Sequence, residues 1–177
     1  MGMGMGMGRH RTWRGIALGA LLAHACAASA ASAASDTLPA LLVPVAGVPS
    51  SALRDTFAEG RPGHRHGAID IAAPRGTAVL AATDGTLVKL FTSKPGGLAI
   101  YQFDRAKVFG YYYAHLDRYA AGVKEGMALR RGDVIGYVGT TGNAPPDAPH
   151  LHFAVFRLGP EKRWWQGEAI DPYPALR

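Results

Sequence analysis

The stretch AIDIAAPRGTAVLAATDGTLVKLF, residues 68–91, indicates the fold class of this 177-residue chain. It contains three short apolar runs, and residues that favour turns separate them. Asp84-Gly85, between the second run and the third, is a hairpin signal. Runs this short and this closely spaced predict β-strands rather than helices. The three expected strands cover residues 68–73, 77–82 and 86–91.

The same pattern continues towards the C-terminus. Turn residues at 94–97 and at Arg131-Gly132-Asp133 separate further apolar runs, and the second turn lies inside an expected hairpin over 127–139. The ending WWQGEAIDPYPAL is expected to be a docked tail. No segment after residue 35 has a long helical periodicity, so we expect an all-β (β-rich) fold with a single antiparallel β-sandwich or open-barrel domain. The further expected strands cover residues 98–103, 108–116 and 150–156.

Residues 1–35 have the features of a secretory signal peptide. A basic stretch at 9–14 precedes a short apolar run at 15–23, and small residues with repeated Ala-x-Ala sites follow. The apolar run is well below the ~20 residues that span a bilayer, so we expect no transmembrane span in the mature form. These features predict an exported protein of the periplasm or cell envelope.

Cys26 leaves a second interpretation of the leader open, because a lipoprotein signal places a cysteine directly after the apolar run. The preceding Ala-His-Ala matches that signal poorly, so plain cleavage is the preferred interpretation. The chain has one cysteine and therefore no intrachain disulfide. We expect residues 36–60 to be an extended lead-in, which either occludes the groove and autoinhibits the domain or packs beside it, and residues 61–177 to be the folded domain.

The charge balance argues against nucleic acid as a partner. The formal net charge is +6, and the leader supplies three arginines and no acid, which leaves +3 for the remainder (+6 − 3). No run of Lys and Arg indicates nucleic-acid binding. A mildly basic surface is compatible with an anionic polymer such as cell wall, and equally with ordinary surface charge. We expect a monomer.

Histidine is concentrated in three short motifs. These are HGAID with His66 and Asp70, YYYAHL with His115, and PHLHF with His150 and His152. Two histidines and a carboxylate can supply three zinc ligands and leave a fourth position open, and the remaining imidazoles can handle protons. The pattern therefore predicts a zinc hydrolase.

The His-x-His pair of PHLHF is expected to place both imidazoles on one face of a strand, because side chains alternate with a period of two. One histidine could then bind a metal while the other reaches its water or the substrate. Alone, such a pair is more often a solvated strand face. The upstream His-x-x-x-Asp and a third histidine favour the metal site.

The HGAID motif needs a bend to serve one ion. Four residues of a straight strand span about 13 Å, so His66 and Asp70 can share a metal only if Gly67 lets the backbone fold. His64 is the competitor, and the four-residue offset favours His66. His64 is expected at the surface or at a groove edge.

In YYYAHL, strand alternation predicts that His115 shares a face with Tyr111 and Tyr113. An aromatic strand with one hydrogen-bonded histidine would be the plain interpretation of this motif alone. The other two motifs make His115 a candidate catalytic residue beside the metal.

In this order and context, the motifs resemble the lysostaphin-type (LytM-like) zinc metallopeptidases, the peptidoglycan endopeptidases. The resemblance runs from about Leu41 to Leu176. It implies zinc ligands at His66, Asp70 and His152, with Zn2+ as the cofactor. The segments that carry the resemblance are GHRHGAIDIAAPRGTAV, YAHL, RRGDVIGYVGTTG, PHLHF and IDPYPAL.

The resemblance also implies catalytic roles for His150 and His115, with His150 on the side of the general base. It implies an open substrate groove on an antiparallel β core, and hydrolysis of peptide cross-links in the peptide stems of peptidoglycan. The chain departs from the family pattern in the Pro-rich loop 143–149 and at Ala154, where an acid often follows HLHF. The alternative is a non-catalytic LytM-like peptidoglycan-binding module or amidase activator, but such members characteristically lose zinc ligands.

Overall fold

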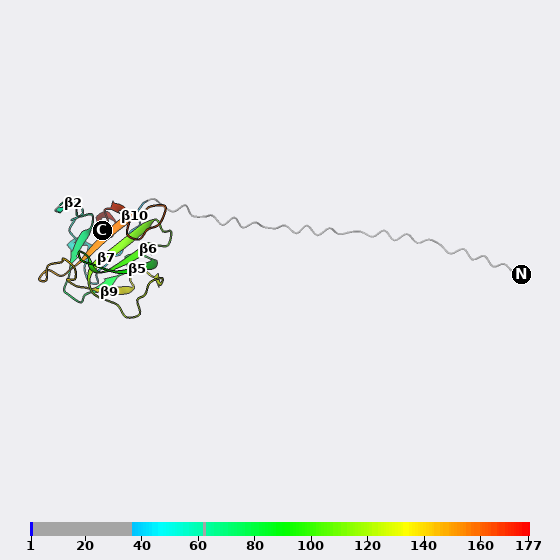
Figure 1. The fold of residues 1–177 in the computed structure, drawn as a ribbon, viewed down its shortest axis with the longest axis horizontal. Coiled ribbons are helices and arrows are strands. Elements are labelled where there is room, and N and C mark those ends of the chain that lie inside the picture. The colour runs from blue at the N-terminus through cyan, green and yellow to red at the C-terminus, as the bar shows by residue number, and fades with distance from the viewer. Residues whose placement is uncertain (2–36, 62) are drawn as a thin grey trace. The chain divides into compact units, whose positions relative to one another are not determined.

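The computed structural model describes Met1 and residues 37–61 and 63–177 (Figure 1). The predicted signal peptide at 1–35, including Cys26, therefore lies outside the described residues, apart from Met1. In the part of the chain that is described, no helix is long and apolar enough to cross a membrane.

The described residues form eleven strands and two 3-10 helices, which are joined by loops. The elements are η1 (Ser50–Ala52), β1 (Gly60–Arg61), β2 (His64–Arg65), β3 (Ile69–Ala72), β4 (Ala78–Leu80), β5 (Gly85–Ser93), β6 (Gly97–Asp104), β7 (Phe109–Tyr119), β8 (Ala128–Leu129), β9 (Val134–Val138), β10 (His150–Leu158), β11 (Gly167–Ile170) and η2 (Tyr173–Leu176).

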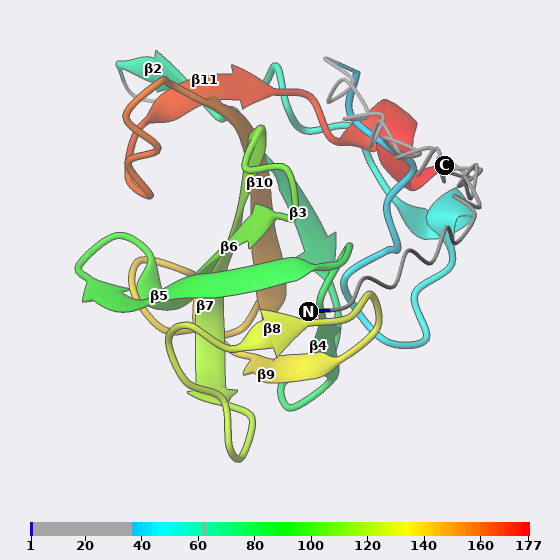
Figure 2. The same ribbon diagram turned by 90° about the vertical axis from the view of Figure 1, so that its right-hand side faces the viewer.

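Strand β10 is central to the antiparallel sheet that fills most of the domain. Along one side it pairs with β7, and along the other it pairs first with β3 and then with β11. From β7 the sheet continues through β6 and β5 to β8, while β9 joins the far end of β7 and carries β4 (Figure 2). Strands β1 and β2 form a separate two-stranded hairpin. These pairings confirm the all-β, antiparallel prediction.

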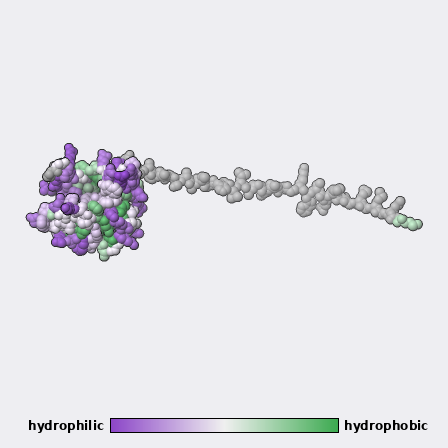
Figure 3. Space-filling view, in the orientation of Figure 1, coloured by the Kyte–Doolittle hydropathy of each residue, from purple (hydrophilic) through white to green (hydrophobic). Residues whose placement is uncertain are grey.

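The alternation along β10 shows how sequence positions the site. Leu151, Phe153 and Val155 are fully buried, because they point into the core. His150 and His152 alternate with them along the strand, are only partly buried, and face the opposite side. On the face of the domain seen in Figure 3, hydrophilic residues predominate and hydrophobic ones gather in a narrower area.

The core contains a polar network whose members satisfy one another. The hydroxyl of Tyr113 donates to Gln102 Oε1 at 2.7 Å and accepts the Ala82 N–H at 3.0 Å. Gln102 Nε2 in turn donates to the Thr83 carbonyl at 2.7 Å. Buried polar groups destabilise a fold unless they are paired, so this network fixes β6 and β7 against the segment after β4.

Two expected hairpins are wrong. Asp84-Gly85 does not form a hairpin turn, because β4 pairs with β9 and not with β5. The Asp84 carboxylate instead accepts the N–H of Arg131 at 2.8 Å. The segment 127–139 forms β8 and β9, but β8 pairs with β5, and β9 pairs with β4 and β7. The Gln102 and Tyr113 network holds the chain after β4 and directs it away from a tight two-residue turn.

Both ends of the described domain belong to the same core. Leu41, Val45 and Leu53, all within the expected lead-in, are buried in the core cluster. The Leu41 N–H donates to the Ala175 carbonyl at 2.8 Å, which ties the lead-in to η2. The expected docked tail also supplies β11, which extends the sheet beyond β10.

Candidate metal centre

Strand register places His152 beside Asp70. The two residues are direct partners between β10 and β3, so their side chains project from the same face of the sheet. His152 Nδ1 lies 3.0 Å from Asp70 Oδ1. The buried neighbours Ile69 and Phe153 hold the two strands from the opposite face.

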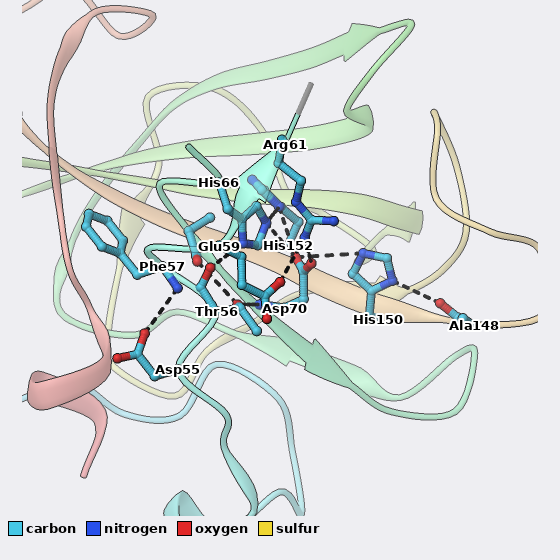
Figure 4. A network of polar contacts seen from close by, with 11 residues as sticks. Asp55, Thr56, Phe57, Glu59, Arg61, His66, Asp70, Ala148, His150 and His152 are labelled. Atoms are coloured by element: carbon cyan, nitrogen blue, oxygen red, sulfur yellow. Dashed lines mark hydrogen bonds and ion pairs between the residues drawn. The ribbon is translucent and has the colours of Figure 1, made fainter. Parts of the chain in front are cut away.

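His66 reaches the same point from the loop that precedes β3. Gly67 has a φ of +65°, a left-handed conformation that glycine adopts without strain, and this bend brings the loop back. The backbone N–H of His66 donates to the Glu59 carbonyl at 2.9 Å. His66 Nε2 then lies 3.2 Å from Asp70 Oδ1 and 3.1 Å from His152 Nδ1 (Figure 4).

A backbone carbonyl sets the tautomer of His66. Its Nδ1 lies 3.0 Å from the carbonyl oxygen of Thr56. A carbonyl can only accept, so Nδ1 carries the proton and Nε2 of the neutral ring presents a lone pair to Asp70 and His152. The Thr56 hydroxyl accepts the Asp70 N–H at 3.1 Å and donates to the Ala68 carbonyl at 3.4 Å. One residue thus positions two of the three converging groups.

These three groups fit a zinc ion. The described residues contain one group of ligating side chains within reach of a common ion, namely His66, Asp70 and His152. The three ligand atoms form a triangle with edges of 3.0, 3.1 and 3.2 Å. Tetrahedral zinc with nitrogen and oxygen ligands at ~2.0–2.1 Å requires edges of about 3.3 Å, and two imidazoles with one carboxylate are typical zinc donors.

The charges around Asp70 keep it ionised. Burial alone would raise its pKa, but the hydrogen bond from His152 and the charges of His152, His66 and His150 lower that pKa to about 2. Arg61 of β1 also lies against this carboxylate, with Nη2 3.0 Å from Oδ2. The two oxygens therefore have separate partners, Oδ1 the imidazoles and Oδ2 the guanidinium. A carboxylate that stays ionised is ready to bind a cation.

His66 is kept neutral by its surroundings. Burial lowers its pKa, and the charges of His152 and Arg61 add to this, although Asp70 and the bond to Thr56 oppose it. A metal ligand must offer a lone pair, so a depressed pKa favours the binding form of the imidazole at neutral pH. His64 lies exposed on β2 and is not among the three converging groups.

His150 and His115 flank this triangle on one side. His150 Nδ1 lies 2.9 Å from the Ala148 carbonyl, so the Nε2 lone pair faces the centre, 3.8 Å from Asp70 Oδ1. His115 Nδ1 lies 2.8 Å from the Thr141 carbonyl, which leaves its Nε2 as the lone-pair nitrogen too. The His115 ring centroid is 4.9 Å from that of His150 and 5.6 Å from that of His152.

His115 does not share a strand face with Tyr111 and Tyr113, as the sequence predicts, and the reason lies in its backbone. His115 has a φ of +59°, and the pairing of β7 with β6 shifts register nearby. Tyr111 and Tyr113 are fully buried in the core, whereas Tyr112 lies on the side of the site, 6.0 Å from His152 between ring centroids. The left-handed residue reverses the alternation, so His115 joins the face of Tyr112.

Thr141 holds this unfavourable backbone in place. A non-glycine residue in the left-handed region costs about 1–3 kcal/mol and persists where the surroundings fix it. Besides the carbonyl that binds His115, the Thr141 hydroxyl donates to the Leu116 carbonyl at 2.7 Å and accepts the Leu98 N–H at 3.0 Å. Burial lowers the pKa of His115, and the charges of His150 and His152 add to that effect.

Sequence reasoning missed Thr56, Arg61 and Thr141. The two threonines act partly through backbone carbonyls, which every residue possesses, so no side-chain pattern marks them. Arg61 precedes the HGAID motif by several residues and belongs to a hairpin too short for a strand pattern to reveal. The motif residues His66, Asp70, His115, His150 and His152 are all brought together.

The chain resembles known peptidases over most of the described domain. The model of peptidase family M23 matches residues 64–172. An L-Ala–D-Glu endopeptidase of Bacillus subtilis is 34% identical over 126 residues, which cover 68% of this chain and 37% of that protein. The glycyl-glycine endopeptidase ALE-1 of Staphylococcus capitis is 36% identical over 116 residues, 65% of this chain and 30% of that one. The chain thus spans little more than a third of these relatives at most.

A solved structure shows the same fold. The catalytic domain of the antimicrobial peptidase lysostaphin from Staphylococcus simulans superposes with a TM-score of 0.55 at 33% identity. The match covers 65% of this chain and 81% of that domain.

Proposed function

The chain belongs to peptidase family M23, and on that premise we propose that it is a zinc-dependent endopeptidase that hydrolyses peptide cross-links in peptidoglycan. Membership confirms the resemblance to lysostaphin-type enzymes. One observation supports the catalytic proposal above the others: His66, Asp70 and His152 converge within 3.2 Å of one another, beside two more imidazoles.

The three converging residues would hold Zn2+ in this proposal. Zinc bound there supplies Lewis acidity, which polarises a carbonyl and makes water easier to deprotonate. Arg61 and Thr56 would keep Asp70 and His66 in the orientation that the ion requires, through the bonds to Asp70 Oδ2 and to His66 Nδ1.

His150 is suited to accept the proton of the attacking water. Its Nδ1–H is engaged by the Ala148 carbonyl, so the lone pair of Nε2 points to the centre and can take up a proton. The same nitrogen can then return the proton to the leaving amine. We assign His150 the role of general base on this geometry.

His115 presents a second acceptor rather than a ready donor. Its Nδ1–H donates to the Thr141 carbonyl, and burial lowers its pKa, so the neutral ring offers the lone pair of Nε2. Stabilisation of an oxyanion by His115 therefore requires that it first gain a proton from the reaction. We propose that His115 and His150 exchange this proton directly beside the centre, where their ring centroids lie 4.9 Å apart.

The wider setting is part of the same proposal. An enzyme that acts on peptidoglycan must leave the cytoplasm, which agrees with export by the leader predicted at 1–35 into the periplasm or envelope. The two relatives named above cut chemically different bonds, L-Ala–D-Glu in one and glycyl-glycine in the other. The proposal accordingly covers the peptide stems and bridges, with the chain acting as a monomer.

Metal content and turnover test the proposal together. We expect the purified protein to bind one zinc per chain and to release peptides from isolated sacculi, detected by mass spectrometry. His152→Ala should lose zinc and activity, and His150→Ala should keep zinc and lose activity. A zinc-loaded protein that leaves cross-linked muropeptides unchanged would instead support the non-catalytic binding module.

A further inference from the structure

A hollow of about 200 Å3 opens beside the metal centre. Two of its lining residues adjoin candidate ligands in sequence: Gly67 follows His66, and Ala154 lies two residues after His152. A larger hollow of about 770 Å3 lies along 157–163 and 166–168, and none of its lining residues adjoins a candidate ligand in sequence. The smaller one is therefore the hollow that continues the site.

The smaller hollow has an aromatic and uncharged lining. Tyr112, Phe156 and Trp165 contribute rings, and Ala154 and Ala169 contribute methyl groups. None of the described residues that line it carries a charge. An ionised group would lose hydration there without gaining an oppositely charged partner, whereas an aliphatic group would be buried favourably.

A chain of ring contacts connects the metal centre to the rim of this hollow. The Tyr112 ring lies 6.0 Å from that of His152, and Tyr101 lies 4.6 Å from Tyr112. Trp164 lies 4.8 Å from Tyr101 and 5.2 Å from Trp165. Trp165 is 60% exposed at this rim, so its ring is accessible to a ligand that enters the hollow.

The floor of the hollow depends on a close approach between strands. The Phe156 ring lies over Gly110 of β7, where a Cβ would come within 2.4 Å of the ring atoms. Ala154 lies between His152 and Phe156 on the same face of β10, so its short side chain leaves the space above the floor open. A longer side chain at this position would fill the hollow.

The spacing matches that of an extended peptide. Residues two apart on a strand are separated by about 6.6–6.8 Å, which is also the repeat of alternate side chains in an extended substrate. A peptide that runs along β10 with its scissile bond at His152 would therefore place a neighbouring side chain over Ala154. The hollow is next to the reacting bond, rather than remote from it.

We propose that this hollow is a specificity pocket for an uncharged aliphatic side chain of the substrate, within two residues of the scissile bond, with Ala154 and Trp165 as its selecting residues. The inference rests on the proposed endopeptidase function and deepens it. The short, uncharged side chain of Ala154 leaves this part of the hollow open and without charge.

Matched peptides test the pocket once mass spectrometry of digested sacculi has located the scissile bond. Peptides carrying leucine or glutamate at each position within two residues of that bond are compared by kcat/KM. We expect leucine to be favoured at least about tenfold at one position. Ala154→Gln should remove most of this preference while zinc content and Tm stay unchanged. Ala128→Gln, the same substitution on the exposed part of β8, is the control.

A binding measurement separates failure of the pocket from failure of the proposed function. The His150→Ala variant in a Trp13→Phe background retains two tryptophans, Trp164 and Trp165, whose fluorescence reports directly on the rim. We expect the leucine peptide to change this emission and to bind at least about tenfold more tightly than its glutamate partner. Trp165→Phe should reduce the change.

The outcomes are distinct. Selective binding without cleavage by the unsubstituted protein would keep the pocket and remove the enzymatic proposal. Cleavage or binding that treats the two peptides alike, or an Ala154→Gln variant with full leucine preference, would overturn the pocket and leave the endopeptidase proposal standing.

Discussion

The carbonyl oxygen of Thr56 lies 3.0 Å from Nδ1 of His66, and this contact determines which nitrogen of His66 faces the candidate metal centre. The same residue uses its hydroxyl to accept the N–H of Asp70 at 3.1 Å. Thr56 lies in a loop ten residues before His66, so the orientation of two candidate ligands depends on a segment outside their own motif.

Removal of the Thr56 hydroxyl should weaken metal binding. Thr56→Val keeps the carbonyl and the side-chain shape but leaves the Asp70 N–H without its acceptor. Partners behind the ligands typically contribute 10–100-fold to metal affinity, so we expect zinc affinity to fall by about tenfold in a chelator competition assay. Thr77→Val, which removes a hydroxyl bonded to the Pro74 carbonyl away from the centre, is the control. Equal affinities in the two variants would contradict the role of Thr56.

Arg61 should affect zinc affinity through the second oxygen of Asp70. Its guanidinium lies 3.0 Å from Oδ2 and holds the carboxylate so that Oδ1 faces the imidazoles. We expect Arg61→Ala to lower zinc affinity by roughly tenfold and Arg61→Lys by less, because lysine keeps the charge and loses the planar fork. The matched control is Arg65→Ala on the paired strand β2. An unchanged zinc affinity in Arg61→Ala would show that the ion pair is incidental.

The stability of the metal-free protein should fall as the pH drops below neutrality. Burial holds the pKa of His115 below its ordinary value of 6.5, so the unfolded chain takes up a proton before the folded one does. The unfolded state then binds more protons, and the free energy of unfolding decreases from about pH 6.5 downwards. His66 contributes in the same direction.

In the variant His115→Gln, the free energy of unfolding should therefore decrease less steeply as the pH falls. Urea unfolding of chelator-treated protein at several pH values between 7.5 and 5.5 measures the slope directly. His64→Gln, at an exposed histidine outside the converging group, is the reference variant. If His115→Gln showed the same slope as His64→Gln, burial of a neutral His115 would not explain the acid sensitivity.

Much of the site follows from strand alternation and motif order. The period of two in HLHF places His150 and His152 on one face, and the structure shows this arrangement. The bend expected at Gly67 is also present, since without it His66 could not approach Asp70. Fold class was predictable for the same reason, because short apolar runs between turn residues leave few alternatives to an antiparallel sheet.

The remaining features depend on contacts that alternation does not encode. His115 occupies a left-handed conformation without being glycine, so the YYYAHL pattern gives no warning that the alternation reverses there. The Asp84-Gly85 pair has the composition of a hairpin turn, but the Asp84 carboxylate binds the Arg131 N–H instead. Long-range hydrogen bonds override local turn preference in this case, and they become visible only in three dimensions.

The two buried tyrosines of β7 provide a direct comparison of paired and unpaired hydroxyls. Tyr111 and Tyr113 have the same ring, are two residues apart and are both fully buried. The Tyr113 hydroxyl has two hydrogen-bond partners, Gln102 and the Ala82 N–H. The Tyr111 hydroxyl is buried without a hydrogen-bond partner in the described structure. The two tyrosines therefore bury similar apolar surface and differ in whether the buried hydroxyl is hydrogen-bonded.

Substitution by phenylalanine should have opposite consequences at the two positions. Tyr113→Phe leaves the Gln102 carbonyl oxygen and the Ala82 N–H unpaired in the core, so we expect a loss of about 1–3 kcal/mol in the free energy of unfolding. Tyr111→Phe removes a hydroxyl that gains nothing from its surroundings, so stability should be unchanged or rise by up to about 1 kcal/mol. Both values come from urea unfolding at pH 7.5, with zinc present in each sample. Equal destabilisation of the two variants would mean that ring packing, rather than hydroxyl pairing, determines the contribution of each tyrosine.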